Sequence, residues 1–204
     1  MNCSGEDDLS DPLTADTLRN PLKAATFGTL IGLLTVTGMR GSEAMRLDGQ
    51  DLDAAGLLTI RATKFRKSRQ LPLHPTTVQA LAGYQVLRDQ LCQPATASLL
   101  VSTTGARLCH ETVQPAFRHL LRQSGIGHGA GRPRATIHGL RHTFAVKTLL
   151  GWYRDGQDVQ ARLPALSTWL GHAGPAATYW YLTATPELLA LAAGRLEAVP
   201  GSAR

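Results

Sequence analysis

Several short stretches of this chain hold side chains that suit chemistry on a phosphate ester. Guanidinium groups bind phosphate oxygens in a bidentate way, and imidazole can move a proton near neutral pH. A tyrosine hydroxyl can attack phosphorus and form a phosphotyrosyl ester, once it is activated from its ordinary pKa of about 10. Four stretches supply these groups, and their chemistry points to a phosphate-bearing substrate.

The first stretch, from Thr37 to Ala44, is a glycine-containing turn that leads into a helix. It presents Arg40 at the helix start, where backbone N–H groups also favour an anion. Glu43 lies three residues further on the same side of the helix and can hold the guanidinium in place. An arginine and a glutamate near a helix start are more often a surface ion pair, so that alternative stays open.

The second stretch is strongly basic and holds Arg61, Lys64, Arg66, Lys67 and Arg69. A mobile turn with this charge could enter a DNA groove and deliver one ammonium group to a scissile phosphate. The alternative is a solvated basic hairpin tip.

The third stretch begins at His138, three residues before Arg141, so both side chains share one face at the start of a helix. Imidazole beside guanidinium at a helix start suits phosphate binding and proton transfer. The alternative is a capping histidine with an exposed arginine. His142 points to a different face and is expected to be structural.

The fourth stretch holds His172 and two tyrosines, Tyr179 and Tyr181. Two positions along a helix rotate a side chain by roughly 200°, so both tyrosines cannot face one phosphate. Aromatic residues in an apolar helix are more often core residues than nucleophiles, and this stretch alone favours a core role.

The elements that must position these residues are predicted from apolar spacing and from capping residues, such as Asn20 before Pro21. Helices are expected over residues 21–36, 42–47, 76–91, 112–123, 139–153, 164–170, 175–182 and 187–198. Strands at 57–62 and 70–73 are expected to form a β-hairpin, with another strand at 98–102 and an exposed loop at 125–134. The predicted fold class is mainly α with a small antiparallel β-sheet (α+β).

Charge is distributed unevenly along the chain. The net charge is +6, but residues 1–16 hold five acidic residues and no basic ones, which leaves 21 basic and 10 acidic residues, or +11, for the rest. Residues 1–16 are therefore expected to be a flexible acidic tail. A basic body favours a polyanionic partner, because neutralising phosphates releases counterions. A general solubilising excess of charge is the alternative.

No segment is apolar for long enough to span a bilayer, and the acidic N-terminus is unlike a secretory signal. The cysteines, Cys3, Cys92 and Cys109, are scattered and lack metal-ligand spacing. We therefore expect no disulfide, no metal site and a cytoplasmic location.

Taken in order, these residues resemble the catalytic set of the tyrosine recombinase (phage integrase) family: Arg40, Lys64, His138, Arg141, His172 and Tyr181. The framing motifs are similar as well. They are Thr-Gly-x-Arg-x-Ser-Glu, Thr-Lys before a basic turn and Leu-Pro-Leu, His-x-Leu-Arg-His-Thr-Phe-Ala, and Leu-Gly-His with a tyrosine nine residues later. The resemblance covers about residues 14–198, and its spacing selects Tyr181 over Tyr179.

The resemblance implies a role for each matched residue. Arg40 and Arg141 would bind the non-bridging oxygens of the scissile phosphate, and His172 would donate a hydrogen bond to it. His138 would assist proton transfer at the nucleophile. Tyr181 would become joined to the 3′-phosphate.

Three further implications concern the leaving group, the energy source and the DNA. Lys64 would protonate the leaving 5′-oxygen, and Glu43 would be an accessory residue. Neither metal, ATP nor another cofactor is implied, because the phosphotyrosyl bond conserves the energy of the phosphodiester. Arg61, Arg66, Lys67 and Arg69 are expected to contact DNA.

The resemblance also implies partners and a domain organisation. The partners would be double-stranded DNA and further copies of the chain, as a tetramer on DNA with a C-terminal helix docking in trans. A monomer without DNA stays open, and no membrane partner is expected. The location would be the cytoplasm, on the nucleoid when DNA is bound. Most family members carry a core-binding domain first, whereas residues 17–204 here are expected to form the catalytic domain alone.

Three alternatives remain at this stage. A type IB topoisomerase has a similar fold and catalytic set, but the framing motifs look like those of a recombinase. A DNA-binding fragment with impaired catalysis would have no need of Tyr181 or Lys64. A metal-dependent nuclease would need a carboxylate cluster that the sequence lacks. The leading expectation is a site-specific recombinase or integrase of a mobile genetic element.

Overall fold

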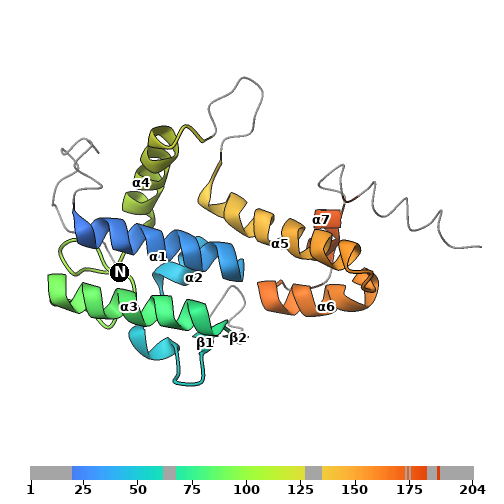
Figure 1. The fold of residues 1–204 in the computed structure, drawn as a ribbon, viewed down its shortest axis with the longest axis horizontal. Coiled ribbons are helices and arrows are strands. Elements are labelled where there is room, and N and C mark those ends of the chain that lie inside the picture. The colour runs from blue at the N-terminus through green and yellow to red at the C-terminus, as the bar shows by residue number, and fades with distance from the viewer. Residues whose placement is uncertain are drawn as a thin grey trace, which may run out of the picture.

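The computed structural model describes residues 20–61, 68–126, 135–172, 174, 176–182 and 188. Within them the chain forms seven α-helices, one short 3-10 helix and a two-stranded antiparallel sheet. In Figure 1, α1 and α3 lie side by side in one half of the molecule, and α5, α6 and α7 pack together in the other half. The predicted fold class, mainly α with a small antiparallel sheet, is confirmed.

The central helix, α1 (Pro21–Thr37), contacts both α3 (Pro75–Leu91) and α5 (Ile137–Arg154). It begins where the Asn20 side chain accepts a hydrogen bond from the backbone N–H of Lys23, as the sequence predicts. It ends at Gly38, whose φ of 63° is left-handed. Because it is apolar on most sides, α1 is buried between its neighbours and carries the start of the candidate site at its C-terminal end.

The predicted hairpin is present as β1 (Leu57–Ile60) and β2 (Arg69–Pro72), which pair from Leu57 opposite Pro72 to Ile60 opposite Arg69. Leu58 and Leu71 face the core, as the alternation along the strands requires. The hairpin follows α2 (Gly41–Met45) and the 3-10 helix η2 (Gly49–Asp51). Residues 62–67, at its tip, lie outside the described part of the chain.

The strand expected at 98–102 is absent, and this prediction was wrong. Only single bridges occur there, between Asp48 and Ser98 and between Val101 and Arg107. Residues 98–101 are nevertheless buried, and the guanidinium of Arg88 satisfies the carbonyls of Ser98 and Leu99 there. A buried loop with its backbone satisfied by an arginine has the same apolar sequence pattern as a buried strand.

Several helices begin earlier than the sequence predicted. The sixth helix, α6 (Val159–Leu170), starts five residues before Pro164, because Asp158 caps it by accepting from the backbone N–H of Ala161. The fourth, α4 (His110–Gln123), likewise starts two residues early and has Pro115 inside it. The last described helix, α7, spans Ala176–Leu182. The predicted tail at 1–16, nearly all of the loop at 125–134 and all of the helix at 187–198 except Leu188 lie outside the described residues.

Two hydrophobic cores lie on either side of the candidate site. One is formed by α1, the hairpin, α3 and α4, and the other by α5, α6 and α7. Trp169 of α6 packs at their boundary: its indole N–H donates to the carbonyl of Thr37 (2.8 Å), and its ring stacks on Phe144. No helix among the described residues has the length and apolarity needed to cross a membrane.

Candidate active site

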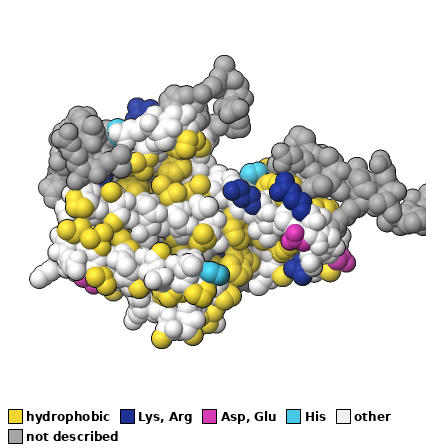
Figure 2. All heavy atoms as spheres, in the orientation of Figure 1, with side chains coloured by type: hydrophobic (Ala, Val, Ile, Leu, Met, Phe, Trp, Pro, Cys, Tyr) yellow, Lys and Arg dark blue, Asp and Glu magenta, His cyan; other side chains and the backbone are white. Residues whose placement is uncertain are grey.

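The candidate site lies where these two halves meet, at the ends of helices and not along them. Arg40 at the start of α2 and Arg141 near the start of α5 both reach the end of α6, and α7 packs against α5 and α6 (Figure 1). On the face shown in Figure 2, Lys and Arg side chains gather over the half that contains α5 and α6, whereas hydrophobic side chains dominate the α1 and α3 half. The starts of α2 and α5 suit an anion because helix N-termini offer unpaired backbone N–H groups, whereas the carbonyls at the end of α6 bind the two guanidiniums.

Arg40 occupies the N-cap of α2, as predicted, and Glu43 fixes it at two points. The backbone N–H of Arg40 donates to one carboxylate oxygen of Glu43 (2.9 Å), and its Nη1 donates to the other (2.9 Å). Its Nη2 also lies 3.5 Å from the carbonyl of Gly171, at the end of α6. The Arg40 side chain is 30% exposed, so the guanidinium is held in place yet stays open to a ligand.

Glu43 is 7% exposed and is charged in this setting. Burial alone would raise the pKa of its carboxyl group, but hydrogen bonds from Arg69 and from the Arg40 backbone, with the positive charge of Arg69, bring the pKa below its ordinary value. The carboxylate is therefore ionised when it binds both arginines, as an accessory residue that orients Arg40 must be.

Arg141 is almost fully buried, at 2% exposure. Its Nη1 donates to the carbonyl of Gly38 (3.0 Å) and its Nη2 donates to the carbonyl of Leu170 (2.8 Å). Burial and the nearby charge of Arg40 lower the pKa of Arg141, and interactions with Tyr181 and Glu43 act in the opposite direction. The two arginines therefore reach consecutive carbonyls at the end of α6 and repel one another across a small space.

His138 lies in the first turn of α5, which starts at Ile137 and is capped by the Thr136 side chain. Partial burial, followed by the charges of Arg141 and Arg40, lowers the pKa of His138. A histidine with a lowered pKa is neutral at pH 7 and can accept a proton.

His172 follows Gly171, the left-handed residue that ends α6. Burial, then the charges of Arg141, Arg40 and Arg69, lower the pKa of His172 to about 4. Its Nδ1 lies 2.8 Å from the hydroxyl of Thr178 on α7. In the neutral ring, a hydroxyl that donates to Nδ1 leaves the proton on Nε2, so the imidazole can act as a hydrogen-bond donor from its other side.

The two tyrosines of α7 are placed very differently. Tyr181 is 5% exposed, its ring stacks on His172 with centroids 6.1 Å apart, and it interacts electrostatically with Arg141. Tyr179 is 46% exposed and its hydroxyl lies 3.5 Å from the side-chain oxygen of Gln160. The structure therefore brings Tyr181, and not Tyr179, to the arginines and His172.

The basic hairpin is placed only in part. Lys64, Arg66 and Lys67 lie outside the described residues. Arg61 is 55% exposed and pairs with Asp51 (2.7 Å). Arg69, expected to face DNA, is instead 9% exposed and pairs with Glu43 (2.7 Å). Its guanidinium is therefore engaged inside the protein, because β2 directs it toward α2 and the end of α6.

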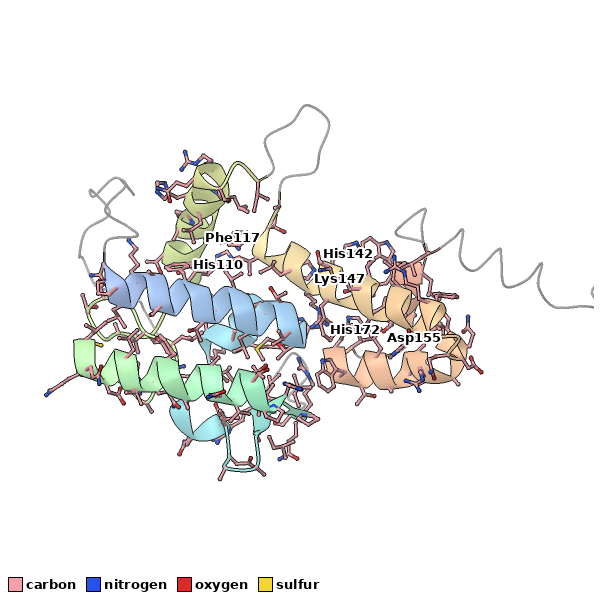
Figure 3. All side chains as sticks on the ribbon, viewed as in Figure 1. His110, Phe117, His142, Lys147, Asp155 and His172 are labelled. Carbon is pink, nitrogen blue, oxygen red and sulfur yellow. The ribbon has the colours of Figure 1, made fainter. Side chains whose placement is uncertain are left out.

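Two residues near the site were given no part in it by the sequence. Thr178 is fully buried and contacts His172, and its place six residues after His172 and three before Tyr181 carries no distinctive sequence signal. His142 was expected to be structural on another face, and it packs its ring 5.3 Å from that of Tyr181. Figure 3 shows His142 on α5 and His172 beyond the end of α6. His142 directly follows Arg141 on α5. Because α5 packs against α7, both side chains reach Tyr181.

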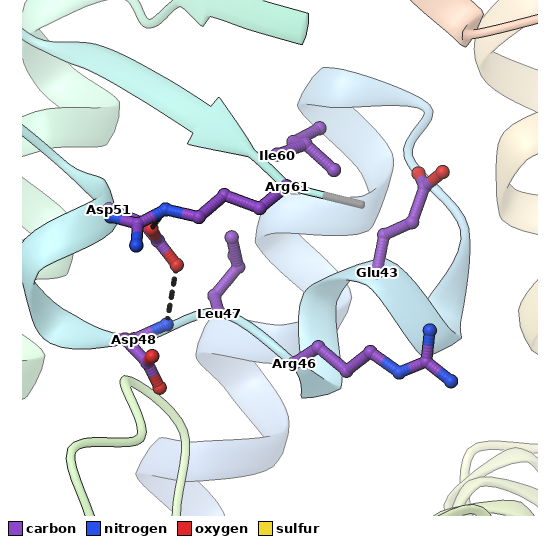
Figure 4. A pocket seen from close by; sticks show the side chains of 7 residues that line it. All are labelled: Glu43, Arg46, Leu47, Asp48, Asp51, Ile60 and Arg61. Atoms are coloured by element: carbon purple, nitrogen blue, oxygen red, sulfur yellow. Dashed lines mark hydrogen bonds and ion pairs between the residues drawn. The ribbon is translucent and has the colours of Figure 1, made fainter. Parts of the chain in front are cut away.

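A separate cavity of about 220 Å³ lies behind α2, on the other side of Glu43 (Figure 4). It is lined by both acidic and basic side chains, including Arg46, Asp48, Asp51 and Arg61. The Asp51 carboxylate accepts from the backbone N–H of Asp48 (2.8 Å) and pairs with Arg61. Glu43, which binds Arg40 and Arg69, also lines this cavity, so the cavity borders the arginine cluster on the side away from His172 and Tyr181.

Comparisons with known proteins support the fold and show to which family the chain belongs. Residues 13–187 match the model of the phage integrase family. Among curated proteins, y4rB of Sinorhizobium fredii, named as an integrase/recombinase, is 43% identical over 182 residues, covering 88% of this chain and 58% of its own length. The tyrosine recombinase XerC of Chromohalobacter salexigens is 32% identical over 181 residues, covering 85% of this chain and 56% of its own length.

Among solved structures, that of the XerA recombinase superposes with a TM-score of 0.65 at 27% identity and covers 90% of this chain and 64% of that one. The XerH recombinase bound to its palindromic difH substrate, in a post-cleavage complex, gives a TM-score of 0.66 at 23% identity, covering 92% of this chain and 48% of that one. The chain thus spans about half the length of the curated relatives that it matches. With its fold, its motifs and these matches in agreement, the chain belongs to the phage integrase family.

Proposed function

We propose that residues 17–204 are the catalytic domain of a site-specific recombinase that cuts and rejoins DNA through a 3′-phosphotyrosyl intermediate. The observation that carries this proposal is the position of Tyr181, buried against His172 and next to Arg141, with Arg40 reaching the same end of α6. Two guanidiniums, an imidazole and a phenol in one place form a site for a phosphate diester that reacts with tyrosine.

In the proposed cleavage step, the Tyr181 oxygen attacks phosphorus and forms the P–O bond to tyrosine while the bond to the 5′-oxygen breaks. His138 assists removal of the phenolic proton, and Lys64 gives a proton to the leaving 5′-oxygen. Arg40 and Arg141 bind the non-bridging oxygens as negative charge develops in the transition state. Religation reverses these steps with a 5′-hydroxyl from another strand, so the proposed cycle uses neither ATP nor a metal ion.

His172 would bind the phosphate as a neutral donor. Its lowered pKa favours a neutral ring, and in a neutral ring that accepts at Nδ1 from the Thr178 hydroxyl the proton is on Nε2. A neutral donor adds a hydrogen bond without a third positive charge beside two guanidiniums. Bound phosphate would then raise the pKa of His172, because its negative charge favours the protonated ring.

The proposed substrate is double-stranded DNA, bound by a homo-oligomer that is a tetramer on the recombining sites. The relatives support this class of substrate, since XerH was solved on its difH substrate and lambda integrase as a dimer on a core site. Arg61 is exposed and suited to a DNA contact, and Arg66 and Lys67 are proposed to act with it. The C-terminal segment after α7 is proposed to dock on a neighbouring copy.

A nicked suicide substrate, built from the DNA repeats that flank the gene, tests the mechanism directly. The wild-type protein should form a covalent adduct that resists denaturing electrophoresis, because the short 5′-hydroxyl product diffuses away before religation. Tyr181→Phe should bind the same DNA and form no adduct. Tyr179→Phe is the matched control, two residues away on the same helix, and should form the adduct. An adduct with Tyr181→Phe, or none with the wild type, would refute the proposed chemistry.

A further inference from the structure

Arg69 makes an unusual set of contacts for a residue of a basic hairpin. Its Nη1 and Nη2 donate to the two oxygens of Glu43, at 3.1 and 2.7 Å. Its Nε donates to the carbonyl of Trp169 at 2.8 Å. One guanidinium therefore joins β2, α2 and the end of α6, three elements that are far apart in the chain.

Glu43 is shared between two arginines, and each makes different use of it. Arg40 uses the carboxylate at the N-cap of α2, where it remains 30% exposed. Arg69 approaches the same carboxylate with both terminal nitrogens and is 9% exposed. A bidentate arginine–carboxylate pair fixes the plane of the carboxylate, so Arg69 determines how Glu43 presents its oxygens to Arg40.

Gly171 shows that Arg69 also shapes the backbone before His172. Gly171 has a φ of 69°, and a side-chain carbon built on it would lie 2.5 Å from Nη1 of Arg69 and 2.9 Å from its Cζ. The guanidinium therefore lies directly against the backbone of Gly171. The glycine of the Leu-Gly-His stretch is required both by its left-handed conformation and by the space that Arg69 occupies.

We propose that Arg69 is a positioning residue of the proposed reaction, which orients Arg40 through Glu43 and orients His172 through the backbone of Trp169 and Gly171. It does not touch the phosphate in this scheme. This inference rests on the proposed function and adds to it. The tip of the hairpin is expected to contact DNA, while Arg69, at the start of β2, positions the residues of the site. The hairpin and the histidine turn would thus be coupled through one side chain.

The electrostatics around His172 offer a readout separate from catalysis. The groups that face His172 are Arg141 from α5, Arg40 from the start of α2, Arg69 from β2, and Thr178 and Tyr181 from α7. The charge of Arg69 contributes to the lowered pKa of His172. Removing that charge should therefore raise the pKa of this one histidine, which a general loss of stability would not do.

The test compares Arg69→Met with Arg88→Met. Arg88 is a matched control in α3, and its side chain is 10% exposed. Like Arg69, it binds one carboxylate and backbone carbonyls, two of them in its case. We expect Arg69→Met to slow cleavage of a suicide substrate at saturating DNA by about tenfold or more, with Kd for DNA changed by less than about threefold. Arg88→Met should lower the unfolding midpoint and leave the cleavage rate of the folded protein within about twofold of wild type.

NMR titration of the His172 ring provides the second measurement, on the free protein. Its pKa should rise in Arg69→Met and stay unchanged in Arg88→Met. An unchanged His172 pKa, or a cleavage rate equal to that of the control, would overturn the proposal. If the wild type forms no covalent adduct, the proposed function fails, and the titration alone still decides whether Arg69 sets the environment of His172.

Two further variants keep the test decisive. Arg69→Lys retains the charge but cannot bridge both oxygens of Glu43, so it should cleave at a rate between those of wild type and Arg69→Met. It replaces Arg69→Met in the cleavage assay if that variant does not fold, and Arg69→Gln replaces it in the titration. The double variant Arg69→Met/Glu43→Gln should lose less in cleavage rate than the product of the two single losses, because both changes break the path from Arg69 through Glu43 to Arg40. Fully multiplicative losses would show that Arg69 does not act through Glu43.

Discussion

The two halves of the molecule hold the two arginines of the candidate site in different ways. Arg141, from the C-terminal half, is buried and bound by two backbone carbonyls, Gly38 and Leu170. Arg40, from the N-terminal half, is partly exposed and bound by the carboxylate of Glu43. The first guanidinium is fixed by main chain and the second by a side chain that Arg69 holds in turn.

This difference separates two roles that the same side-chain type can have. Because Arg141 on α5 binds the carbonyl at the end of α1, it joins the two halves as well as contributing charge to the site. Arg40 contributes charge at a helix start whose structure does not depend on its guanidinium. An arginine that binds main-chain carbonyls helps to hold the fold together. An arginine that is bound by a side chain can be replaced while the fold stays intact.

Replacing Arg141 with alanine should therefore have the largest effect, on both activity and stability. Loss of a donor to developing charge costs about 3 kcal/mol in the transition state, or on the order of a hundredfold in cleavage rate. Two buried carbonyls also lose their partner, at about 1–3 kcal/mol each when left unsatisfied. Suicide-substrate kinetics and urea unfolding should both change. An Arg141→Ala variant as stable as wild type would contradict the role of Arg141 in joining the two halves.

Arg40→Ala should lose a similar factor in cleavage, on the order of a hundredfold, for the same electrostatic reason. Its free energy of unfolding should fall by less than about 1 kcal/mol, because Glu43 keeps Arg69 and the residue 40 backbone N–H as partners. The same two assays measure this variant beside Arg141→Ala. Equal stability losses in the two would remove the distinction between the halves.

Gly38→Ala probes the junction of the halves without touching a charge. Gly38 has a φ of 63°, and an added side-chain carbon would collide with the ring of Phe144. Overpacking of this kind costs about 1–3 kcal/mol. Gly28→Ala is the control, since Gly28 lies inside α1 with nothing near the added carbon, and it should be neutral or stabilising by up to about 1 kcal/mol. Thermal or urea unfolding ranks the two, and the reverse order would contradict the packing described.

A pH dependence of stability arises in the C-terminal half. The pKa of His172 is lowered from 6.5 to about 4 in the folded protein, so the unfolded chain binds more protons between these values. The contribution of His172 to stability is therefore present above pH 6.5 and is lost as pH falls toward 4. In His172→Gln, the free energy of unfolding should fall less steeply over this window. Parallel curves for the two proteins, measured by urea unfolding at several pH values, would rule the contribution out.

Local sequence was sufficient to predict most of the elements and two pairs of residues in the candidate site. His138 and Arg141 share a helix face because they are three residues apart, and Arg40 and Glu43 meet across a helix start for the same reason. These two relations hold over a few residues, so the backbone geometry of one helix fixes them. The choice of Tyr181 over Tyr179 came instead from the family resemblance, through its spacing from His172.

The partners of the site residues came only from the tertiary structure. The carbonyl that binds Arg141 is 103 residues away in the chain, and the carboxylate that binds Arg69 is 26 residues away. Arg69 looked like one more surface charge because its neighbours in sequence are basic, while its neighbours in space are Glu43 and Gly171. The sequence thus determined which groups were available, and packing of the two halves decided which of them face one another, because contacts across such distances depend on the whole fold.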